Sequence, residues 1–564
     1  MKTMSLKKSS IELLSPCGSP DTLDAAIKGG ADAVYLGGTI LNARMNARNF
    51  SDTDLTSAID KCHNNGVRIY ITLNTLVYDK EFDEAVRYAA KLHKMGVDAF
   101  IIADTGLAVT LKHFMPDIEL HASTQMTGHN TFAAVRLAEI GFTRMVCARE
   151  LSLYDIKTLA EKSPVEIEMF IHGAHCVSVS GQCLMSSFIG GRSGNRGECA
   201  QPCRMKYNNA YPLSLKDMCL AGHMTEILDS GVKSLKIEGR MKPPGYVYTV
   251  TSVYRQLIDE KRNAVTAETE KLSKIFSRSG FTDGYFTGNI TKTMLGIRTE
   301  SDKNDTQNQK VAYKNSNRKS EPILINQRDI ALPEDKIKPD KSTEKLTPNT
   351  SARFTNSAQI PQNHGFDIIY LPLDKYHEAA DGIILPAVIK DSGINEIKQA
   401  VKQGVKHALI GNIGHIELLV GYDIILHGDY RLNIFNNASM KYYEIFSDNI
   451  LSPELTLPQI RDIGGNKCVI VYGKIPVMTL ERGIDTQSLK DRTNTVFPVY
   501  KEGNRDIVYN SVPIYMADKK GDLKKTGIMN THFIFTDENK SEVLKIIDLY
   551  REGLPYHKNF KRIK

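Results

Sequence analysis

The sequence has few features of a membrane or secreted protein. No stretch of its 564 residues is apolar for long enough to span a bilayer, and residues 1–10 are polar, without an apolar signal core. The net charge is only +7, which permits an RNA partner but does not by itself argue for one. We therefore expect a cytoplasmic protein with no membrane contact. Its thiols should be reduced, which favours metal binding over disulfides.

The motifs of common hydrolases are also missing. The sequence contains neither a Gly-x-Ser-x-Gly elbow nor a His-Glu-x-x-His helix. His172 and His175 are close in sequence, but no carboxylate is in register with them for a metalloprotease site. We find no nucleophile or activated water for hydrolysis.

Four of the nine cysteines lie in one glycine-rich stretch with the spacing Cys-x6-Cys-x15-Cys-x3-Cys. Four thiolates within reach of one point suit a zinc ion or a 4Fe–4S cluster. Structural zinc sites favour two short Cys-x2–4-Cys pairs, and only the last pair here is that short, so we place the cluster ahead of zinc. Buried core cysteines are the third interpretation, which the polar surroundings disfavour. Cys219 is a candidate substitute ligand, and Cys17 is a candidate to face the same site. The four cysteines are Cys176, Cys183, Cys199 and Cys203.

Short apolar runs alternate with helix-length amphipathic segments in the first half. Strand–helix alternation predicts a parallel sheet covered by helices, and eight strands predict a (β/α)8, TIM-barrel-like domain. A doubly wound open sheet is the alternative. Helices are expected near residues 19–29, 52–65, 80–95 and 153–161. The expected strands are residues 12–16, 33–37, 68–74, 99–104, 118–123, 144–149, 166–173 and 234–239.

A chain of this length should form two or more domains. We expect the first domain at residues 1–288, with a cysteine-rich segment at 172–204. Residues 289–365 are polar and predict a flexible linker. Residues 366–564 predict a second, smaller α/β domain that faintly repeats the first, as an incomplete barrel for substrate binding or assembly.

Polar side chains gather where the predicted barrel strands end, which is the face that carries the active site in barrel enzymes. Taken singly, such residues are only strand ends that meet water, but the convergent set predicts a site. From side-chain chemistry we assign proton transfer to His121, Glu150 and Glu238. Substrate or anion binding is assigned to Asn74, Gln125, Arg149, His172, Lys236 and Arg240.

Basic residues surround the cysteine stretch, and tyrosines are interleaved with them. This combination suits an RNA backbone with bases stacked on the rings, and a solvated basic rim is an equally good interpretation. The basic residues are Arg192, Arg196, Arg204, Lys206, Lys233, Lys236, Arg240 and Lys242, and the tyrosines are Tyr207, Tyr246 and Tyr248.

Residues 168–186, EMFIHGAHCVSVSGQCLMS, closely resemble the signature of the collagenase-like peptidase family, peptidase family U32. Supporting matches are LLSP at 13–16, GADAVYLG at 30–37, HASTQ at 121–125, NRGECAQPCR at 195–204, SLKIEGRMK at 234–242 and GFTDGY at 280–285. The region with RLNIFN at 431–436 and LSPEL at 451–455 looks like the extra domain of longer family members.

The resemblance implies a TIM-barrel-like catalytic domain with a 4Fe–4S cluster on Cys176, Cys183, Cys199 and Cys203. It further implies hydroxylation of a base in transfer or ribosomal RNA, giving 5-hydroxycytidine or 5-hydroxyuridine, with prephenate or a related metabolite as co-substrate. A collagenase-like peptidase is the alternative that the family name suggests. A non-catalytic RNA-binding factor is a third hypothesis.

Overall fold

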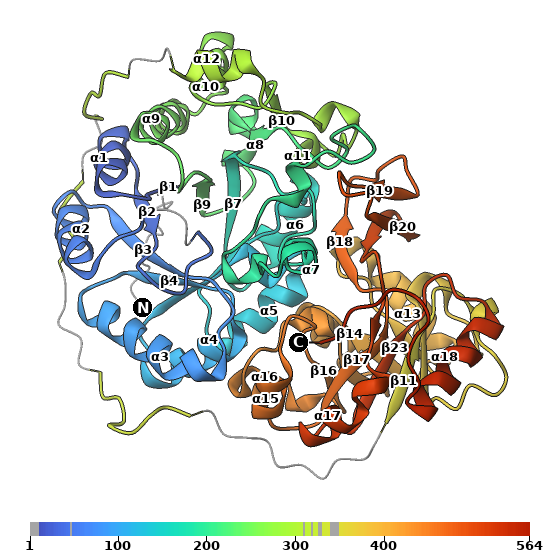
Figure 1. Cartoon of the computed structure of the whole chain (residues 1–564). Helices are drawn as coiled ribbons and strands as arrows, with labels where there is room; N and C mark the ends of the chain where they lie inside the picture. The colour runs from blue at the N-terminus through green and yellow to red at the C-terminus, as the bar shows by residue number, and fades with distance from the viewer. Residues whose placement is uncertain are drawn as a thin grey trace.

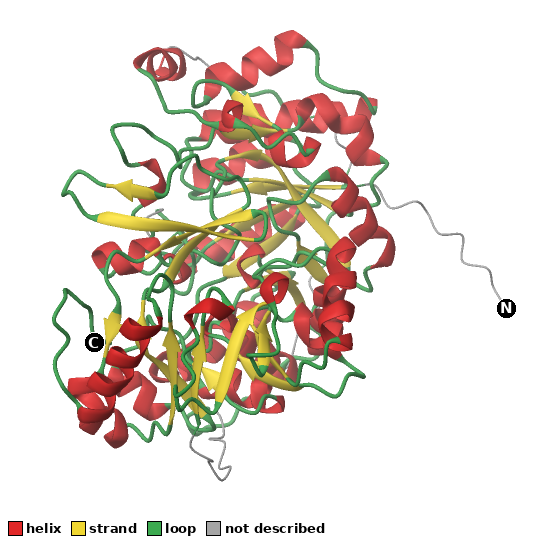
Figure 2. Ribbon diagram, turned by 90° about the vertical axis from the view of Figure 1, so that its right-hand side faces the viewer, coloured by secondary structure: helices red, strands yellow, loops and turns green. Residues whose placement is uncertain are grey.

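The computed structural model describes residues 11–44, 48–307, 311–316, 320–324, 330–338 and 349–563. Two barrels lie side by side, each with helices on the outside of its strands (Figures 1 and 2). No helix in the described ranges combines the length and the apolar character that a membrane span requires.

The first barrel confirms the predicted strands and their order. Each strand pairs in parallel with the next, and β9 pairs with both β7 and β1, so the sheet closes and the open-sheet alternative is excluded. Polar N-caps such as Ser19, Ser51 and Ser152 set the starts of the helices that follow the strands. The strands are β1 (Glu12–Pro16), β2 (Ala33–Leu36), β3 (Arg68–Leu73), β4 (Ala99–Ile102), β5 (Glu119–Ala122), β6 (Arg144–Val146), β7 (Glu166–Gly173) and β9 (Ser234–Ile237). The helices are α1 (Pro20–Gly29), α2 (Asp52–Asn64), α3 (Asp79–Lys94), α4 (Thr105–Phe114), α5 (Thr131–Ile140), α6 (Leu153–Lys162), α8 (Met224–Leu228) and α9 (Pro244–Glu260).

The cysteine-rich residues lie in the long connection between β7 and β9, residues 174–233, which we call the cysteine segment. It contains α7 (Met185–Gly190) and β8 (Asp217–Cys219), and β8 runs antiparallel to the end of β7. After the barrel come α10 (Thr266–Ile275), β10 (Phe281–Thr282) and α11 (Gly284–Thr287). The connection therefore starts at the carboxyl end of a barrel strand, on the face where barrel enzymes place their chemistry.

The predicted linker is only partly linker. Residues 308–310, 317–319, 325–329 and 339–348 lie outside the described residues. Before them, α12 (Glu300–Gln307) forms a helix, and after them β11 (Thr350–Arg353) pairs with two strands of the second barrel. The second sheet thus begins before residue 366, with β11. The composition did not reveal this strand, because its residues are small or polar rather than apolar.

The second domain is a closed barrel, so the expectation of an incomplete one was wrong. Its parallel strands follow chain order, β16 pairs with β17, and β23 lies between β17 and β11. The strands are β11, β12 (Ile368–Pro372), β13 (Gly382–Ile384), β14 (His407–Ile410), β15 (Ile425–Gly428), β16 (Asn449–Ile450), β17 (Lys467–Gly473) and β23 (Asn530–Ile534). The helices are α13 (Ile394–Lys402), α14 (Gly414–Leu419), α15 (Asn437–Tyr442), α16 (Leu457–Asp462), α17 (Lys520–Lys525) and α18 (Lys540–Glu552).

The repeat noticed in the sequence is real at the seventh strand of each barrel. Strands β7 and β17 both end in a glycine with positive φ, Gly173 at +106° and Gly473 at +129°. A Cβ on Gly173 would lie 2.5 Å from the backbone oxygen of Glu238, directly after β9. A Cβ on Gly473 would lie 2.2 Å from that of Ile534, the last residue of β23. Both strands then pair with a short antiparallel strand, β8 in one barrel and β22 (Ile514–Tyr515) in the other.

The barrels pack through a matching pair of helix contacts, α4 on α15 and α5 on α14. A Cβ on Gly106 of α4 would lie 2.5 Å from the Oδ1 of Asn436, the N-cap of α15. In the same way, a Cβ on Gly414 of α14 would lie 2.7 Å from the Oδ1 of Asn130, the N-cap of α5. Each barrel thus offers a glycine to the capped helix end of the other, which permits close backbone contact.

A four-stranded antiparallel sheet connects β17 of the second barrel to the cysteine segment. It contains β18 (Pro476–Leu480), β19 (Ser488–Lys490), β20 (Val496–Glu502) and β21 (Arg505–Tyr509). The backbone N–H of Val179 donates to Thr479 at 2.7 Å, and that of Leu184 donates to Val477 at 2.9 Å. The second domain therefore holds the segment that carries the cysteines.

Candidate active site

The carboxyl-end mouth of the first barrel holds one carboxylate among several cations. Glu238, which directly follows β9, lies 3.4 Å from Arg149 and 3.4 Å from Arg44. Burial alone would raise the pKa of Glu238, but Arg44 and Arg149, followed by Arg240 and Lys236, outweigh it and lower that pKa. The mouth is therefore cationic around an ionised carboxylate.

A rigid polar rim supports these groups. Arg240 is buried, and it donates to the Thr72 hydroxyl at 2.8 Å and to the Asn42 side chain at 3.1 Å. Burial and the nearby Arg44 lower the pKa of Arg240 to about 10. Asn74, predicted to bind substrate, accepts the backbone N–H of Ala43 at 3.0 Å, so it orders the loop after β2.

Two buried nitrogens at this mouth have no partner among the described residues, Nε of Arg149 and Nδ1 of His175. The guanidinium of Arg149 also lies over the Phe170 ring, 4.1 Å from its centroid. Nε of Arg149 is a donor, and a buried donor without an acceptor is costly, so it marks a place where a ligand oxygen would be favourable.

The four clustered cysteines lie beside this mouth. All nine cysteines of the chain are free thiols; Cys176 and Cys199 are exposed, and Cys183 and Cys203 are partly buried. Burial and then the neighbouring cysteines raise the pKa of Cys183 and Cys203, to about 12 for Cys203. The thiols of Cys183, Cys199 and Cys203 thus lie in one neighbourhood, and a shared metal site on the four cysteines stays a prediction.

Arg44 pairs with Glu238 at the barrel mouth and is influenced by the thiols of Cys176 and Cys199. Arg44 was not predicted from the sequence as a site residue. Glu238 raises the pKa of Arg44 most, and Cys176 and Cys199 contribute in the same direction. Arg44 lies in the loop after β2, in the run LNARMNAR at residues 41–48, of which 45–47 lie outside the described residues. The basic character of a loop after a barrel strand was the available signal, and it is a weak one.

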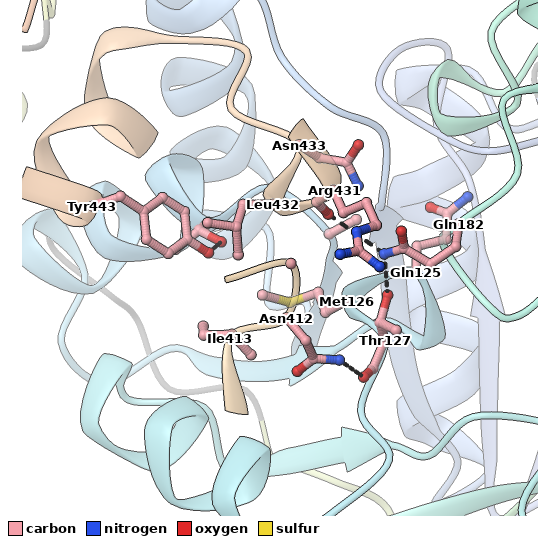
Figure 3. Close-up of a pocket in the computed structure, with 13 residues that line it drawn as sticks. Gln125, Met126, Thr127, Gln182, Asn412, Ile413, Arg431, Leu432, Asn433 and Tyr443 are labelled. Atoms are coloured by element: carbon pink, nitrogen blue, oxygen red, sulfur yellow. Dashed lines mark hydrogen bonds between the residues drawn. The ribbon is translucent and has the colours of Figure 1, made fainter. Parts of the chain in front are cut away.

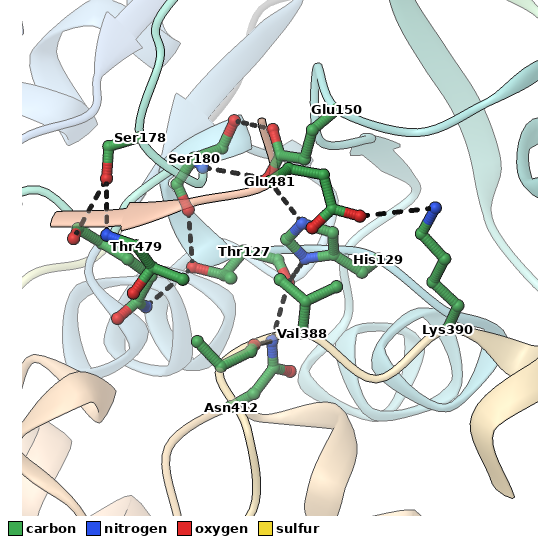
Figure 4. A network of polar contacts seen from close by, with 12 residues as sticks. Thr127, His129, Glu150, Ser178, Ser180, Val388, Lys390, Asn412, Thr479 and Glu481 are labelled. Atoms are coloured by element: carbon green, nitrogen blue, oxygen red, sulfur yellow. Dashed lines mark hydrogen bonds and ion pairs between the residues drawn. The ribbon is translucent and has the colours of Figure 1, made fainter. Parts of the chain in front are cut away.

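Glu150 anchors the cysteine segment through Ser180 (Figure 4). Its carboxylate accepts from Nε2 of His129 at 2.6 Å and from the backbone and hydroxyl of Ser180 at 3.0 and 3.1 Å. Burial would raise the pKa of Glu150, but His129 and these hydrogen bonds lower it to about 2. The Thr127 hydroxyl also donates to the Ser180 carbonyl, at 3.0 Å.

His121 and Lys236 lie inside the barrel rather than at its rim. Lys236 is paired with Glu168 at 2.8 Å, and Arg144 bridges Glu168 and Glu12 at 3.3 and 2.6 Å. Burial and then Arg144 hold the pKa of His121 well below its usual range. This network fills the barrel interior with compensated charge, and it separates His121 from Glu238 as a proton-transfer partner.

His172 is buried among the rings of Tyr246, Tyr254 and Phe281. It meets Tyr254 at 3.3 Å through Nδ1, and its ring lies 5.3 Å from that of Phe281. Burial, and secondarily Lys242, lowers the pKa of His172 to about 3. Its Nε2 is buried without a partner among the described residues, and its predicted role in substrate binding stays a prediction.

Gln125 lines a cavity between the barrels rather than the mouth itself (Figure 3). Arg431 and Asn412 of the second barrel line the same cavity. Gln182 of the cysteine segment reaches into it, and its amide donates to Thr127 at 3.1 Å. The predicted role of Gln125 in substrate binding stays a prediction.

Three further expectations need correction. Tyr207 and Tyr246 are fully buried, so they offer no ring on which an RNA base could stack. Cys17 is buried, and its thiol meets the Thr22 carbonyl at 3.8 Å, so it faces helix α1 instead of the site. Cys219 meets Tyr254 at 3.7 Å beside His172, and it does not join the four clustered thiols.

The clustered cysteines fit a four-thiolate group by their chemistry. Two of them are solvent-exposed, and the backbone N–H of Gln201 donates to the Cys199 sulfur at 3.3 Å. Within the described ranges, no three His, Cys, Asp or Glu side chains already stand close enough together to hold a metal ion. The thiols would therefore have to draw together around a bound group.

The sequence model of peptidase family U32 matches residues 18–295, which cover the first barrel after β1 and the cysteine segment. A Porphyromonas gingivalis protein named collagenase is 35% identical over 311 residues, which are 49% of this chain and 73% of that protein. The chain belongs to peptidase family U32. Within the family, other relatives carry names from RNA modification.

The 23S rRNA 5-hydroxycytidine C2501 synthase of Escherichia coli is 40% identical over 51% of this chain and 45% of its own length. The tRNA hydroxylation protein P1 of Bacillus subtilis is 37% identical over 44% of this chain and 63% of its own length. The chain thus spans about half to two thirds of these two U32 relatives.

Proposed function

We propose that this U32 chain is an iron–sulfur-dependent RNA base hydroxylase that forms 5-hydroxycytidine or 5-hydroxyuridine in ribosomal or transfer RNA. The observation that carries the proposal is Arg44, which pairs with Glu238 of the barrel mouth at 3.4 Å and whose pKa is raised by Glu238 and, less strongly, by Cys176 and Cys199. A redox group on the cysteines and an anion at the mouth would therefore be neighbours. The names of the relatives supply the reaction class.

Cys176, Cys183, Cys199 and Cys203 would hold the 4Fe–4S cluster. When bound there, such a cluster supplies one-electron transfer. The amide of Gln201 would stabilise charge on the Cys199 sulfur, and Glu150 keeps the segment against the barrel through Ser180. A cytoplasmic location suits these residues, because all nine cysteines are free thiols.

Arg44 and Arg149 would bind an anionic co-substrate, for which we propose prephenate or a related carboxylate. Both guanidinium groups already face a carboxylate, that of Glu238, and Nε of Arg149 is free to donate to a ligand. The cations around Glu238 lower its pKa and keep it ionised; as a weak base, it would accept a proton only from an acidic group of a bound molecule. The roles proposed for His121 and Glu150 in proton transfer have less geometric support than that of Glu238.

RNA would approach over the exposed part of the cysteine segment. Arg192 and Lys206 are exposed there, whereas Arg204 is engaged with Ser214 at 3.0 Å and with the His175 carbonyl at 3.1 Å. The solvated basic rim is thus smaller than the sequence suggested. Backbone contacts from a few cations would position RNA without reading its sequence.

The proposal is tested by iron analysis and by nucleoside mass spectrometry. Anaerobically purified protein should be coloured and contain about four irons per chain, and a deletion strain should lack one 5-hydroxypyrimidine. A Cys176→Ala/Cys199→Ala variant should lose its iron and should fail to restore the 5-hydroxypyrimidine when expressed in the deletion strain. Cys468→Ala, in the second barrel, should keep its iron and restore the nucleoside. A colourless protein with stoichiometric zinc, or unchanged nucleosides in the deletion strain, would refute the proposal. Gelatin hydrolysis by the double variant would favour a peptidase instead.

A further inference from the structure

The second barrel has a cavity of about 180 Å³ at the carboxyl ends of its strands. Its floor is made by Arg353 at the end of β11, by Pro372 at the end of β12 and by Thr536 just after β23. A single water needs only about 10–15 Å³ of such volume, so the cavity can hold a small organic molecule. It lies where barrel enzymes bind their ligands.

The antiparallel sheet covers this cavity. Tyr500 and Lys501 of β20 and Tyr509 of β21 line it from above. The rings of Tyr500 and Tyr509 lie 5.4 Å apart at 63°, and they form an apolar wall beside the polar floor. An apolar wall with a few convergent polar groups is typical of small-molecule sites.

Arg353 is a buried cation in this cavity, and Glu502 and Tyr509 pair with only part of its guanidinium group. Arg353 is 6% exposed, and its Nη1 is buried without a hydrogen-bond partner among the described residues. Its Nη2 reaches Glu502 only at 4.0 Å. A buried donor without an acceptor is unfavourable, and an oxyanion would give the free Nη1 a charge-assisted hydrogen bond.

The remaining charges around the cavity also favour an anion. Lys375 and Lys501 line it, both are exposed, and neither forms an ion pair within the described part of the chain. Glu502 is the single carboxylate among the lining residues. Three cations therefore face one carboxylate, and a bound carboxylate or phosphate group would balance them.

We propose that the second barrel binds a small organic anion, held through its carboxylate or phosphate group by Arg353, with Lys375 and Lys501 at the entrance. This site is separate from the cysteines and from Glu238, and it does not depend on the proposed hydroxylase function. Negative results in the iron or nucleoside tests would not affect the anion-site proposal. A negative result in the anion titration would not affect the hydroxylase proposal.

The test is calorimetric titration of the full-length protein with inorganic phosphate, with succinate and with the neutral analogue succinamide. Because Arg44 and Arg149 could bind the same anions, the titrations are repeated in Arg44→Met protein. We expect saturable binding of phosphate or succinate in both proteins, with no binding of succinamide. Tighter phosphate binding would assign a phosphoryl ligand, and tighter succinate binding a carboxylic acid.

Substitutions of the lining residues then test whether the anion binds in this cavity. Arg353→Met should weaken binding roughly tenfold or more, the value of a lost charge-assisted hydrogen bond. Lys501→Ala should weaken it by about threefold without affecting folding, because this lysine is exposed. The matched exposed lysine variant, Lys398→Ala on α13, should bind as the parent does. Absence of saturable anion binding, equal binding of succinamide, or unchanged affinity in Lys501→Ala and folded Arg353→Met would overturn the proposal. If Arg353→Met does not fold, Lys501→Ala decides.

Discussion

Replacing Glu150 by glutamine should loosen the cysteine segment without touching a cysteine. The Glu150 side chain is buried, and its two oxygens accept three hydrogen bonds, one from His129 and two from Ser180. Glutamine has nearly the same size, but an amino group replaces one of the accepting oxygens. The perturbation is therefore electrostatic and local.

The magnitude follows from the pKa of Glu150, which is about 2 in the folded protein against an ordinary 4.5. At 1.36 kcal/mol per unit, this difference corresponds to about 3 kcal/mol of stabilisation at neutral pH. Because the folded pKa is the lower one, the stabilisation is fully present above about pH 4.5 and is lost as the pH falls towards 2. The deficit of Glu150→Gln should thus shrink from about 3 kcal/mol at pH 7 to roughly 2 kcal/mol at pH 3.5.

Urea unfolding followed by far-ultraviolet circular dichroism measures the deficit, since the chain has no tryptophan for fluorescence. The rates at which the clustered thiols react with iodoacetamide, read by mass spectrometry, report local opening of the segment. Glu139→Gln is the matched control, because Glu139 is 52% exposed and pairs with Arg136 on the surface. Its deficit should stay below about 1 kcal/mol.

Equal urea midpoints for Glu150→Gln and the parent at pH 7 would refute the anchoring role. A deficit that is the same at pH 7 and at pH 3.5 would show that the ionised carboxylate is not its source. Faster thiol labelling with an unchanged midpoint would instead place the whole effect in local opening of the segment.

Three further predictions concern the mouth, the barrel contact and the cysteines. Arg44→Met should reduce RNA hydroxylation in a complemented deletion strain by roughly tenfold or more with unchanged circular dichroism; full rescue would show that Arg149 alone suffices. Gly106→Ala should lower the free energy of unfolding by about 1–3 kcal/mol, because its Cβ would lie 2.3 Å from the Ser439 nitrogen. Gly521→Ala, whose Cβ would meet nothing within 4 Å, is the control, and equal urea midpoints for the two would contradict the close contact. Iron uptake by metal-free protein should rise with pH, because burial raises the pKa of Cys203 to about 12 and the ligand is the thiolate; uptake independent of pH would argue against thiolate ligation.

Local patterns predicted the first barrel well, because each strand and helix there has its own signal. Apolar runs gave β1 and β7 at their observed bounds, and the Ser19 cap marked the start of α1. The second barrel was harder to predict. Its strand β11 is short, contains Thr350 and Ser351, and is stabilised by pairing with β12 and β23 rather than by its own composition.

The sequence by itself indicated the family through its motifs, and local periodicity determined the order of the strands in the first barrel. Short spacing predicted that Cys176, Cys183, Cys199 and Cys203 serve one site. Only the tertiary structure decided which charged residues share a site. It placed Arg44 and Glu238, far apart in the sequence, within 3.4 Å of each other. It also directed Glu150 to Ser180 and closed the second barrel over its own cationic cavity. These outcomes depend on contacts between distant segments, and no pattern within a single segment encodes them.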